Sequence, residues 1–181
     1  MTSVPKQFTP TRQVPKQGLA EKIRRAVPNN IPLEFGETKT DVDVRLKPEH
    51  LLDVVRVLKE HRDLAFDFLR NMAGVDMQEQ GLHLKIHLYS FKHNHTVQLT
   101  VECPPEEDHP HVPSLTSLYR AADWHEREAA EMFGFIFDGH PNLKNLLLEE
   151  DLHIHPLLKA HPLQEPEILQ GIEEGPPGFP F

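Results

Sequence analysis

Two runs of alternating apolar and polar side chains, separated by a short polar segment, constrain the fold of this chain more than any other feature. The runs span residues 83–91 and 96–103, and the segment between them reads Lys-His-Asn-His. Alternation with a period of two is typical of a strand that buries one face and exposes the other. The apolar residues that would face the core are Leu84, Ile86, Leu88, Val97, Leu99, Val101 and Cys103. The sequence therefore predicts an antiparallel hairpin with one face on a core and one face free.

The rest of the chain supplies helix and strand patterns on both sides of this hairpin. Two helices are predicted at 19–27 and 48–61. A third is predicted to start after Ser114, which would cap it. A fourth would run from Trp124, with Asp123 as its cap, to a glycine stop at Gly134. Strands are predicted at 32–37, 40–46, 65–72 and 135–137, with a turn at 74–76 and irregular structure from Pro104 to Pro113. This order predicts an α+β fold class: a helix-backed, mainly antiparallel sheet followed by a helix and an extended, loop-rich C-terminal segment.

Charge and proline content divide the chain into four parts. Residues 1–17 are predicted to be a disordered basic arm and residues 18–113 an α+β domain, followed by a helix with docking loops at 114–162 and an extended acidic, Pro-rich tail at 163–181. The first 30 residues carry six basic side chains against one acid, whereas the whole chain has a net charge of −9. An acidic body argues against nucleic-acid binding, which needs clustered Lys and Arg. No apolar run approaches the roughly 20 residues that cross a bilayer.

The stretch from Ala121 to Pro162 carries charged, apolar and turn-forming residues at fixed spacings. It contains Glu-Arg-Glu at 126–128, an acid and two apolar residues at 131–133, Gly-His-Pro at 139–141, lysine at 144, two leucines at 146–147 and His-Pro-Leu at 155–157. On a helix, Arg127 and Glu131 are neighbours at i,i+4, and the simplest interpretation is a solvated face with weak ion pairs. Proline-fixed turns beside a charged helix favour another interpretation, a surface completed by a second subunit.

This spacing resembles the signature of the 30-kDa subunit family of respiratory complex I, known in bacteria as the C subunit. Every gap of the family pattern is matched from Glu126 to Leu147, and the residues at 112–115 and 122–124 are also similar. The resemblance covers residues 30–162. It implies a subunit of the peripheral arm of a complex I-type NADH:quinone oxidoreductase, which transfers electrons from NADH to quinone and couples this transfer to proton translocation.

The resemblance implies a structural role, with no catalytic residue and no metal in this chain. NADH, FMN, the iron–sulfur clusters and quinone would all be bound by partner subunits. The residues agree, since one cysteine cannot hold an iron–sulfur cluster and no glycine-rich nucleotide loop is present. The implied partners are the large quinone-site subunit of the 49-kDa type and the neighbouring iron–sulfur subunits. The implied location is peripheral, on the cytoplasmic side of a bacterial inner membrane, with membrane contact only through the complex.

The residues expected to dock on the large subunit lie in the matched motif and in the turns after it. They are Trp124, Glu126, Arg127, Glu128, Glu131, His140, Pro141, Lys144, His155, Pro156 and Lys159. One segment departs from the family pattern: Leu158-Lys159-Ala160-His161 keeps the lysine but lacks an arginine, whose paired donors leucine cannot replace. Either the partner has changed to match, or the chain is a divergent member. The equivalent subunit of a membrane-bound hydrogenase-like complex stays open as the alternative.

Thirteen histidines leave a different class of function open. His-x-His pairs at 93/95, 109/111 and 153/155 have the spacing of zinc ligands on a strand, which would suit a zinc hydrolase. No His-Glu-x-x-His sequence accompanies them, and Glu126 and Glu128 would point far apart on a helix. A free-standing adaptor domain is the third alternative. We therefore expect a docking surface here rather than an acid–base or metal site.

Overall fold

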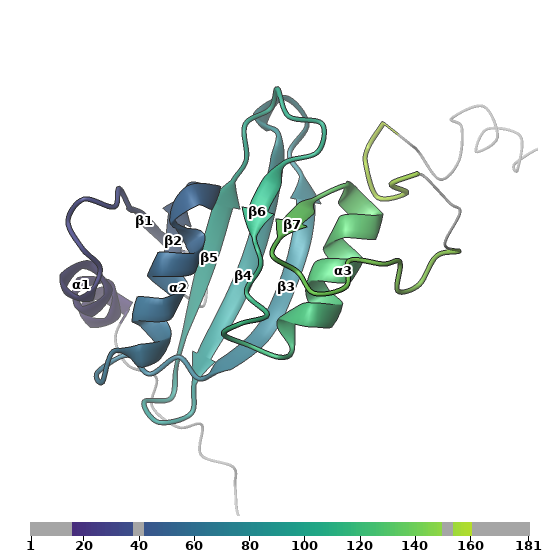
Figure 1. Cartoon of the computed structure of the whole chain (residues 1–181). Coiled ribbons are helices and arrows are strands. Elements are labelled where there is room, and N and C mark those ends of the chain that lie inside the picture. The colour runs from purple at the N-terminus through teal and green to yellow at the C-terminus, as the bar shows by residue number, and fades with distance from the viewer. Residues whose placement is uncertain (1–15, 38–41, 150–153, 161–181) are drawn as a thin grey trace, which may run out of the picture.

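The computed structural model describes residues 16–37, 42–149 and 154–160, and these build a five-stranded sheet with helices on one face (Figure 1). The strands are β1 (Glu34–Glu37), β2 (Val42–Leu46), β3 (Phe68–Asp76), β4 (Leu82–Ser90) and β5 (His95–Glu102). Their order across the sheet is β1-β2-β5-β4-β3. All neighbours pair antiparallel except β2 and β5, which are parallel. The predicted fold class, α+β with a mainly antiparallel sheet, is confirmed.

The predicted hairpin forms the middle of this sheet. β4 pairs with β5 in the register Leu84↔Val101, Ile86↔Leu99 and Leu88↔Val97, and all six side chains are fully buried. The opposite face carries polar side chains that bond to one another. Asp43 Oδ1 accepts hydrogen bonds from Thr100 Oγ1 at 2.7 Å and from Gln98 Nε2 at 3.0 Å. The alternation seen in the sequence therefore separates an apolar face from a hydrogen-bonded polar face.

The described residues also form three α-helices and two short 3-10 turns. They are α1 (Lys16–Ala26), η1 (Pro48–His50), α2 (Leu51–Glu60), η2 (Gln78–Gln80) and α3 (Ala122–Phe133). The apolar stripe of α2, formed by Leu51, Val54, Val55 and Leu58, is buried. Such a stripe at i, i+3 and i+4 packs one side of a helix on a core. α2 and α3 lie over the same face, towards opposite edges of the sheet (Figure 1).

The strand predicted at 65–72 lies further along the chain, as β3, and the turn predicted at 74–76 is wrong. Ala65 has a φ of 46° and belongs to the turn after α2, so the strand begins later. Gly74 lies inside the strand because α3 packs directly over it. A Cβ at Gly74 would overlap the ring of Phe133. The glycine that suggested a turn is needed for this close packing, and the chain turns instead at η2.

Two further predictions around Pro104–Ser114 are wrong. The end of the segment expected to be irregular contains β6 (His111–Pro113), which pairs in parallel with β7 (Ile136–Asp138). No helix follows Ser114, and the chain makes turns in which the N–H of Tyr119 donates to the carbonyl of Leu115 at 2.8 Å. The Ser114 hydroxyl donates to Glu126 of α3 instead of capping a helix. Ser114 Oγ also accepts the N–H of Thr116 at 3.2 Å, so it joins a local turn to α3.

The four-part division of the chain stays a prediction. The predicted tail and almost all of the predicted basic arm lie outside the described residues, and Lys16 and Gln17 belong to α1. The predicted parts 18–113 and 114–162 are in contact, because α3 packs on β3. Residues Ala129 and Phe135 join the same hydrophobic cluster as the sheet. The signature helix is therefore built onto the core that the sheet and α2 form.

Candidate docking site

α3 ends at a left-handed glycine between two histidine rings. Gly134 has a φ of 86°, and its N–H donates to the carbonyl of Ala130, which is the stop predicted from the sequence. His155 Nδ1 donates to the carbonyl of Glu131 at 2.9 Å, and His109 Nδ1 donates to that of Gly134 at 3.2 Å. A Cβ on Gly134 would lie 2.9 Å from His109 Nδ1 and 3.0 Å from His155 Cδ2. Both the backbone and the available space therefore require glycine.

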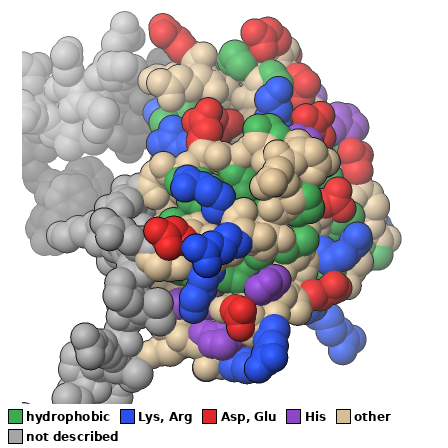
Figure 2. Space-filling view, turned by 90° about the vertical axis from the view of Figure 1, so that its left-hand side faces the viewer, with side chains coloured by type: hydrophobic (Ala, Val, Ile, Leu, Met, Phe, Trp, Pro, Cys, Tyr) green, Lys and Arg blue, Asp and Glu red, His purple; other side chains and the backbone are tan. Residues whose placement is uncertain are grey.

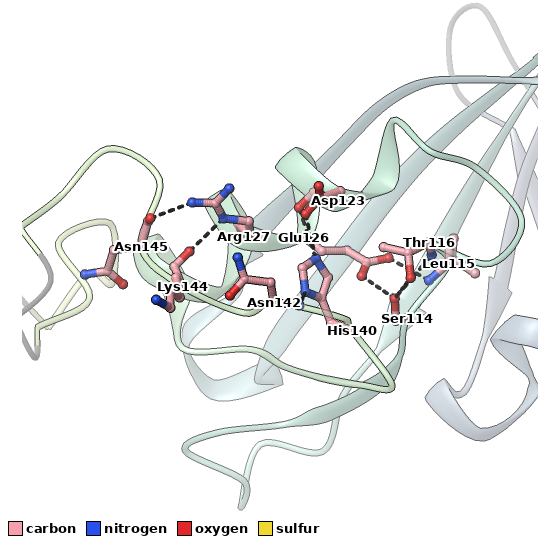
Figure 3. Close-up of polar contacts among 10 residues, drawn as sticks. All are labelled: Ser114, Leu115, Thr116, Asp123, Glu126, Arg127, His140, Asn142, Lys144 and Asn145. Atoms are coloured by element: carbon pink, nitrogen blue, oxygen red, sulfur yellow. Dashed lines mark hydrogen bonds and ion pairs between the residues drawn. The ribbon is translucent and has the colours of Figure 1, made fainter.

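The start of α3 differs from the prediction by two residues, and the predicted cap at Asp123 is wrong. Ala121 occupies the cap position, without a side-chain hydrogen bond, and Asp123 lies in the first turn of the helix. Asp123 instead meets His140, whose Nε2 donates to the Asp123 carbonyl at 3.2 Å and lies 3.2 Å from its Oδ1 (Figure 3). His140 Nδ1 accepts the N–H of Asn142 at 3.0 Å. The imidazole side chain is fully buried, so it fastens the Gly-His-Pro turn to the start of α3.

Arg127 and Glu131 bind the backbone of the same loop, Arg127 through the loop's carbonyl groups and Glu131 through the loop's N–H groups. Arg127 Nε and Nη2 donate to the carbonyls of Lys144 and Asn145 at 2.8 and 2.7 Å (Figure 3). The Glu131 carboxylate accepts the N–H groups of Leu146 at 2.7 Å and of Leu147 at 3.0 Å. Arginine has only donors and an ionised carboxylate only acceptors, so the pair matches a stretch of backbone. We call residues 144–148 the clamped loop.

The weak ion pair between Arg127 and Glu131 that the helix spacing suggested is absent from the ion pairs of the described residues. Their spacing at i,i+4 instead places both side chains on one side of α3, where the clamped loop passes. Arg127 and Glu131 therefore bond to the chain's own backbone. These bonds hold the clamped loop in place at the surface.

Glu126 points in the opposite direction, into the core. It is 0% exposed, and its carboxylate accepts the Ser114 hydroxyl at 2.7 Å and the Leu115 N–H at 2.6 Å. Burial raises the pKa of the Glu126 carboxyl, and the bonds from Ser114 and Leu115 and the nearby His140 offset part of this rise. Glu126 therefore joins α3 to the 114–116 segment and has no exposed surface for a partner.

The segment after the clamped loop is fastened to the same end of α3. Besides the bond from His155, the N–H of Leu157 donates to the carbonyl of Met132 at 3.2 Å. The N–H of Lys159 donates to Asp76 Oδ2, at the end of β3, at 2.9 Å. Pro156 is half-buried within this segment. The second His-Pro turn thus satisfies carbonyls that a helix end leaves without partners.

Several large apolar side chains remain exposed in this part of the chain. Trp124 and Leu147 are each 66% exposed, and three further large apolar side chains are exposed nearby in sequence, Leu143, Ile154 and Leu157. A hollow of about 510 Å³ lies between Trp124 and Leu146, with Arg120, His125 and Glu128 on its rim. A second, of about 720 Å³, is lined by Leu143, Lys144, Ile154 and the Arg127 side chain. Of the predicted docking residues, Trp124, Glu128, Pro141, Lys144 and Lys159 are exposed.

The histidine pairs at 93/95 and 109/111, which lie within the described residues, bond to other groups of the chain. Within the described ranges there is no group of three His, Cys, Asp or Glu residues arranged to hold a metal ion. His93 Nε2 and His95 Nε2 donate to the carbonyls of Arg62 and Leu64 at 3.0 and 2.9 Å. His109 and His111 bond to different partners, the Gly134 carbonyl and Asp138. His153, of the third pair, lies outside the described residues.

Comparison with known proteins decides the family. The family described as "Respiratory-chain NADH dehydrogenase, 30 Kd subunit" matches residues 44–167. This match covers more than half of the chain and includes every residue of the motif. The chain belongs to this family. The resemblance stated from the spacing of Glu126 to Leu147 is therefore confirmed.

Relatives in the family match most of the chain. The C subunit of the NADH-quinone oxidoreductase of Roseiflexus sp. (strain RS-1) is 41% identical over 150 residues, which cover 82% of this chain and 84% of the relative. The protein of the same description from Salinispora tropica is 33% identical over 174 residues, covering 90% of this chain and 70% of the relative. Family membership therefore rests on both the sheet and the signature segment.

Solved structures share the fold at lower identity. A chain of the archaeal membrane-bound sulfane sulfur reductase superposes with a TM-score of 0.70 at 18% identity, over 91% of this chain and 95% of that one. The trypsin-resistant fragment of Nqo5 superposes with a TM-score of 0.52 at 24% identity, over 70% of this chain and 98% of the fragment. Among the described residues, no helix is long and apolar enough to cross a membrane.

Several residues that shape this site were not predicted. Ser114 was expected to cap a helix, and Asp76 and His109 were assigned no role in it. Asp76 and His109 lie outside α3 in the sequence, and each reaches the site through one hydrogen bond with a backbone group, the Lys159 N–H for Asp76 and the Gly134 carbonyl for His109. Such contacts leave no spacing pattern in a sequence. The family motif marks the helix and the loops, but not the groups that fasten them.

Proposed function

We propose that this chain is the C subunit of a complex I-type NADH-quinone oxidoreductase, a structural subunit that braces the large quinone-site subunit. The observation that carries the proposal is the identity of 41% over 150 residues to the C subunit of an NADH-quinone oxidoreductase. Flavin, iron–sulfur clusters and quinone would be bound by partner subunits, and the chain would reach the membrane only through the complex. Electrons would pass from NADH to quinone, on the cytoplasmic side of a bacterial inner membrane, without crossing this chain.

The geometry of the signature segment supports a docking role. The side chains of Arg127, Glu131 and His140 form hydrogen bonds with the chain's own backbone. Their effect is to fix the positions of exposed apolar side chains on α3 and on the clamped loop. Interfaces that bind tightly are centred on apolar and aromatic anchors whose positions are fixed in advance. In the proposed interface, Trp124 and Leu147 are these anchors, and the charged residues position them.

A second candidate is the equivalent subunit of another membrane-bound respiratory assembly. The TM-score of 0.70 to a chain of the membrane-bound sulfane sulfur reductase shows that the fold occurs in such an assembly. Its sequence identity is 18%, whereas the NADH-quinone oxidoreductase relative is 41% identical. The higher identity favours the first candidate, and the partners that co-purify distinguish the two.

The test is purification of the native complex through a tag on this chain. Mass spectrometry should identify a large quinone-site subunit and a flavin-bearing, NADH-oxidising subunit, and the preparation should reduce quinone with NADH. Nickel-bearing subunits, or a sulfur reductase in place of the NADH-oxidising subunit, would support the second candidate. Recovery of the chain alone would favour a free-standing adaptor and refute the proposal.

The interface is tested with a matched pair of variants. Trp124→Ala should weaken association with the large subunit by ~2 kcal/mol, since it removes a large aromatic anchor. Phe91→Ala is the control, because Phe91 is equally exposed, at 66%, but lies at the β4–β5 turn. Recovery of the large subunit should fall for the first variant and not for the second. Equal recovery with both variants would place the interface elsewhere.

A further inference from the structure

The outer face of α1 carries a group of basic side chains at the edge of the sheet far from α3. Leu19, Ile23 and Val27 bury the inner face of this segment against the core. Lys22, Arg24 and Arg25 are exposed, as is one acid of the same helix, Glu21. Figure 1 places α1 and α3 on opposite sides of the molecule, and Figure 2 views the α1 side, where Lys and Arg side chains gather in the middle. We call Lys22, Arg24 and Arg25 the basic face.

Within the described part of the chain, the three cations of the basic face outnumber the one acid of α1, Glu21. None of its three residues belongs to an ion pair among those residues. The Arg24 guanidinium lies 4.5 Å above the centre of the Phe35 ring, which restricts its position without reducing its charge. The whole chain has a net charge of −9, so this group of like charges contrasts with the rest of the molecule. A net excess of partly ordered cations is typical of a surface that meets an anionic partner.

Neither the helix dipole nor membrane binding explains all three cations of the basic face. Cations in the last turn of a helix are stabilised by the helix dipole, which covers Arg24 and Arg25 but not Lys22, one turn earlier. A basic amphipathic helix can also lie on an anionic membrane, but it does so by burying its apolar face in the lipid. The apolar face of α1 is already buried in the protein, with Ile23 at 0% exposure. The basic face therefore offers charge without an apolar surface to insert.

We propose that the basic face docks a carboxylate-rich segment of a neighbouring protein subunit. Glu and Asp side chains from an extended segment would pair with Lys22, Arg24 and Arg25, and two of these cations can bind a carboxylate through paired N–H donors. This contact goes beyond the proposed function, since it is separate from α3 and the clamped loop. It gives the chain a second attachment on the opposite side of the sheet.

Zero-length cross-linking of the purified complex tests the occupant. A carbodiimide joins lysine amines to carboxylates that touch them, so Lys22 should be linked to a Glu- or Asp-containing peptide of another subunit, identified by mass spectrometry. Arg25→Lys should add a second link to the same peptide, and Lys22→Gln should remove the first. Links only to acids of residues 163–181 of this chain would assign the face to its own tail and overturn the proposal. The absence of any link at Lys22 and at the introduced lysine would also overturn it.

A second test uses the isolated full-length chain and a labelled peptide of ten glutamates. Replacing all three residues by Gln should weaken binding about tenfold, as expected for three exposed pairs, and binding should weaken as salt rises. The matched control is Arg62→Gln/Arg70→Gln/Lys92→Gln, which removes the same charge from exposed positions elsewhere and should bind as wild type does. Equal weakening in both variants would refute a site on α1. Retention on phosphatidylglycerol vesicles that depends on the basic face would refute it in favour of a membrane. Because this test needs no partner subunit, its result is independent of the proposed function.

Discussion

Glu126 offers the sharpest test of how this segment is built, because the structure places a motif carboxylate inside the protein. The informative changes are Glu126→Ala, which removes the acceptor, and Glu126→Gln, which keeps its shape and one acceptor oxygen. In the wild type the carboxylate accepts the Leu115 N–H at 2.6 Å and the Ser114 hydroxyl at 2.7 Å, with no exposed surface. If these bonds hold α3 to residues 114–116, the two variants will differ strongly.

The magnitude follows from what each variant leaves without a partner. In Glu126→Ala the buried Leu115 N–H loses its acceptor, which lowers the free energy of unfolding by about 2 kcal/mol. The Ser114 hydroxyl can still bond to Thr116 Oγ1, 2.8 Å away, so its loss is smaller, and the missing methylene adds about 1 kcal/mol. The expected destabilisation is therefore ~3 kcal/mol. In Glu126→Gln the amide oxygen accepts from Leu115 and the amide nitrogen donates to Ser114, which limits the loss to ~1 kcal/mol.

The pH dependence gives an independent check on the same residue. Burial raises the pKa of the Glu126 carboxyl above its ordinary value of 4.5, so the folded protein holds this proton more tightly than the unfolded chain. The stability from this group is then fully present below pH 4.5 and is lost as pH rises through the folded-state pKa. The stability of the wild type relative to Glu126→Gln should therefore fall as pH rises above 4.5, and then level off.

Urea unfolding followed by circular dichroism at 222 nm measures both effects on the isolated chain. The reasoning is refuted if Glu126→Ala unfolds within ~1 kcal/mol of the wild type at the same m-value, the slope that reports exposed surface. It is also refuted if the Gln variant is as unstable as the Ala variant, or if the stability of the wild type relative to Glu126→Gln does not change with pH. Either of the first two results would mean that the carboxylate is not the acceptor that joins the two segments, and the third would mean that burial does not raise the pKa of Glu126.

Three further predictions concern other parts of the chain. Glu131→Ala should raise amide hydrogen exchange across residues 146–148 while leaving β4 and β5 protected, and unchanged exchange would argue against the clamped loop. Gly74→Ala should destabilise the fold by ~2 kcal/mol or more in thermal or urea unfolding, because its Cβ would overlap Phe133; a neutral result would show that α3 is free to shift. Burial raises the pKa of Cys103 to about 12, so its thiol should resist iodoacetamide at pH 8 until the chain is unfolded, and rapid labelling of the folded protein would contradict this.

Much of the sheet could be predicted because its elements are defined by local periodicity. The alternation in 83–91 and 96–103 reports a buried face, and β4 and β5 were placed within one residue. The helix predicted at 48–61 was also found, although its first three residues form the 3-10 turn η1. The turn predicted at 74–76 failed because a glycine has two possible uses, a turn or a close approach. Only the position of Phe133 over Gly74 selects the second use, and that contact joins residues far apart in the sequence.

The sequence by itself determined the family and the position of the candidate site. The spacing from Glu126 to Leu147 is a property of the chain order, and the match over residues 44–167 agrees with it. Tertiary structure alone decided which of those residues face inward. Glu126 and Arg127 are adjacent in the chain, yet one is buried against Ser114 and the other reaches the clamped loop. Direction on a helix changes by about 100° per residue, and only the packing of α3 on β3 determines which direction points into the core.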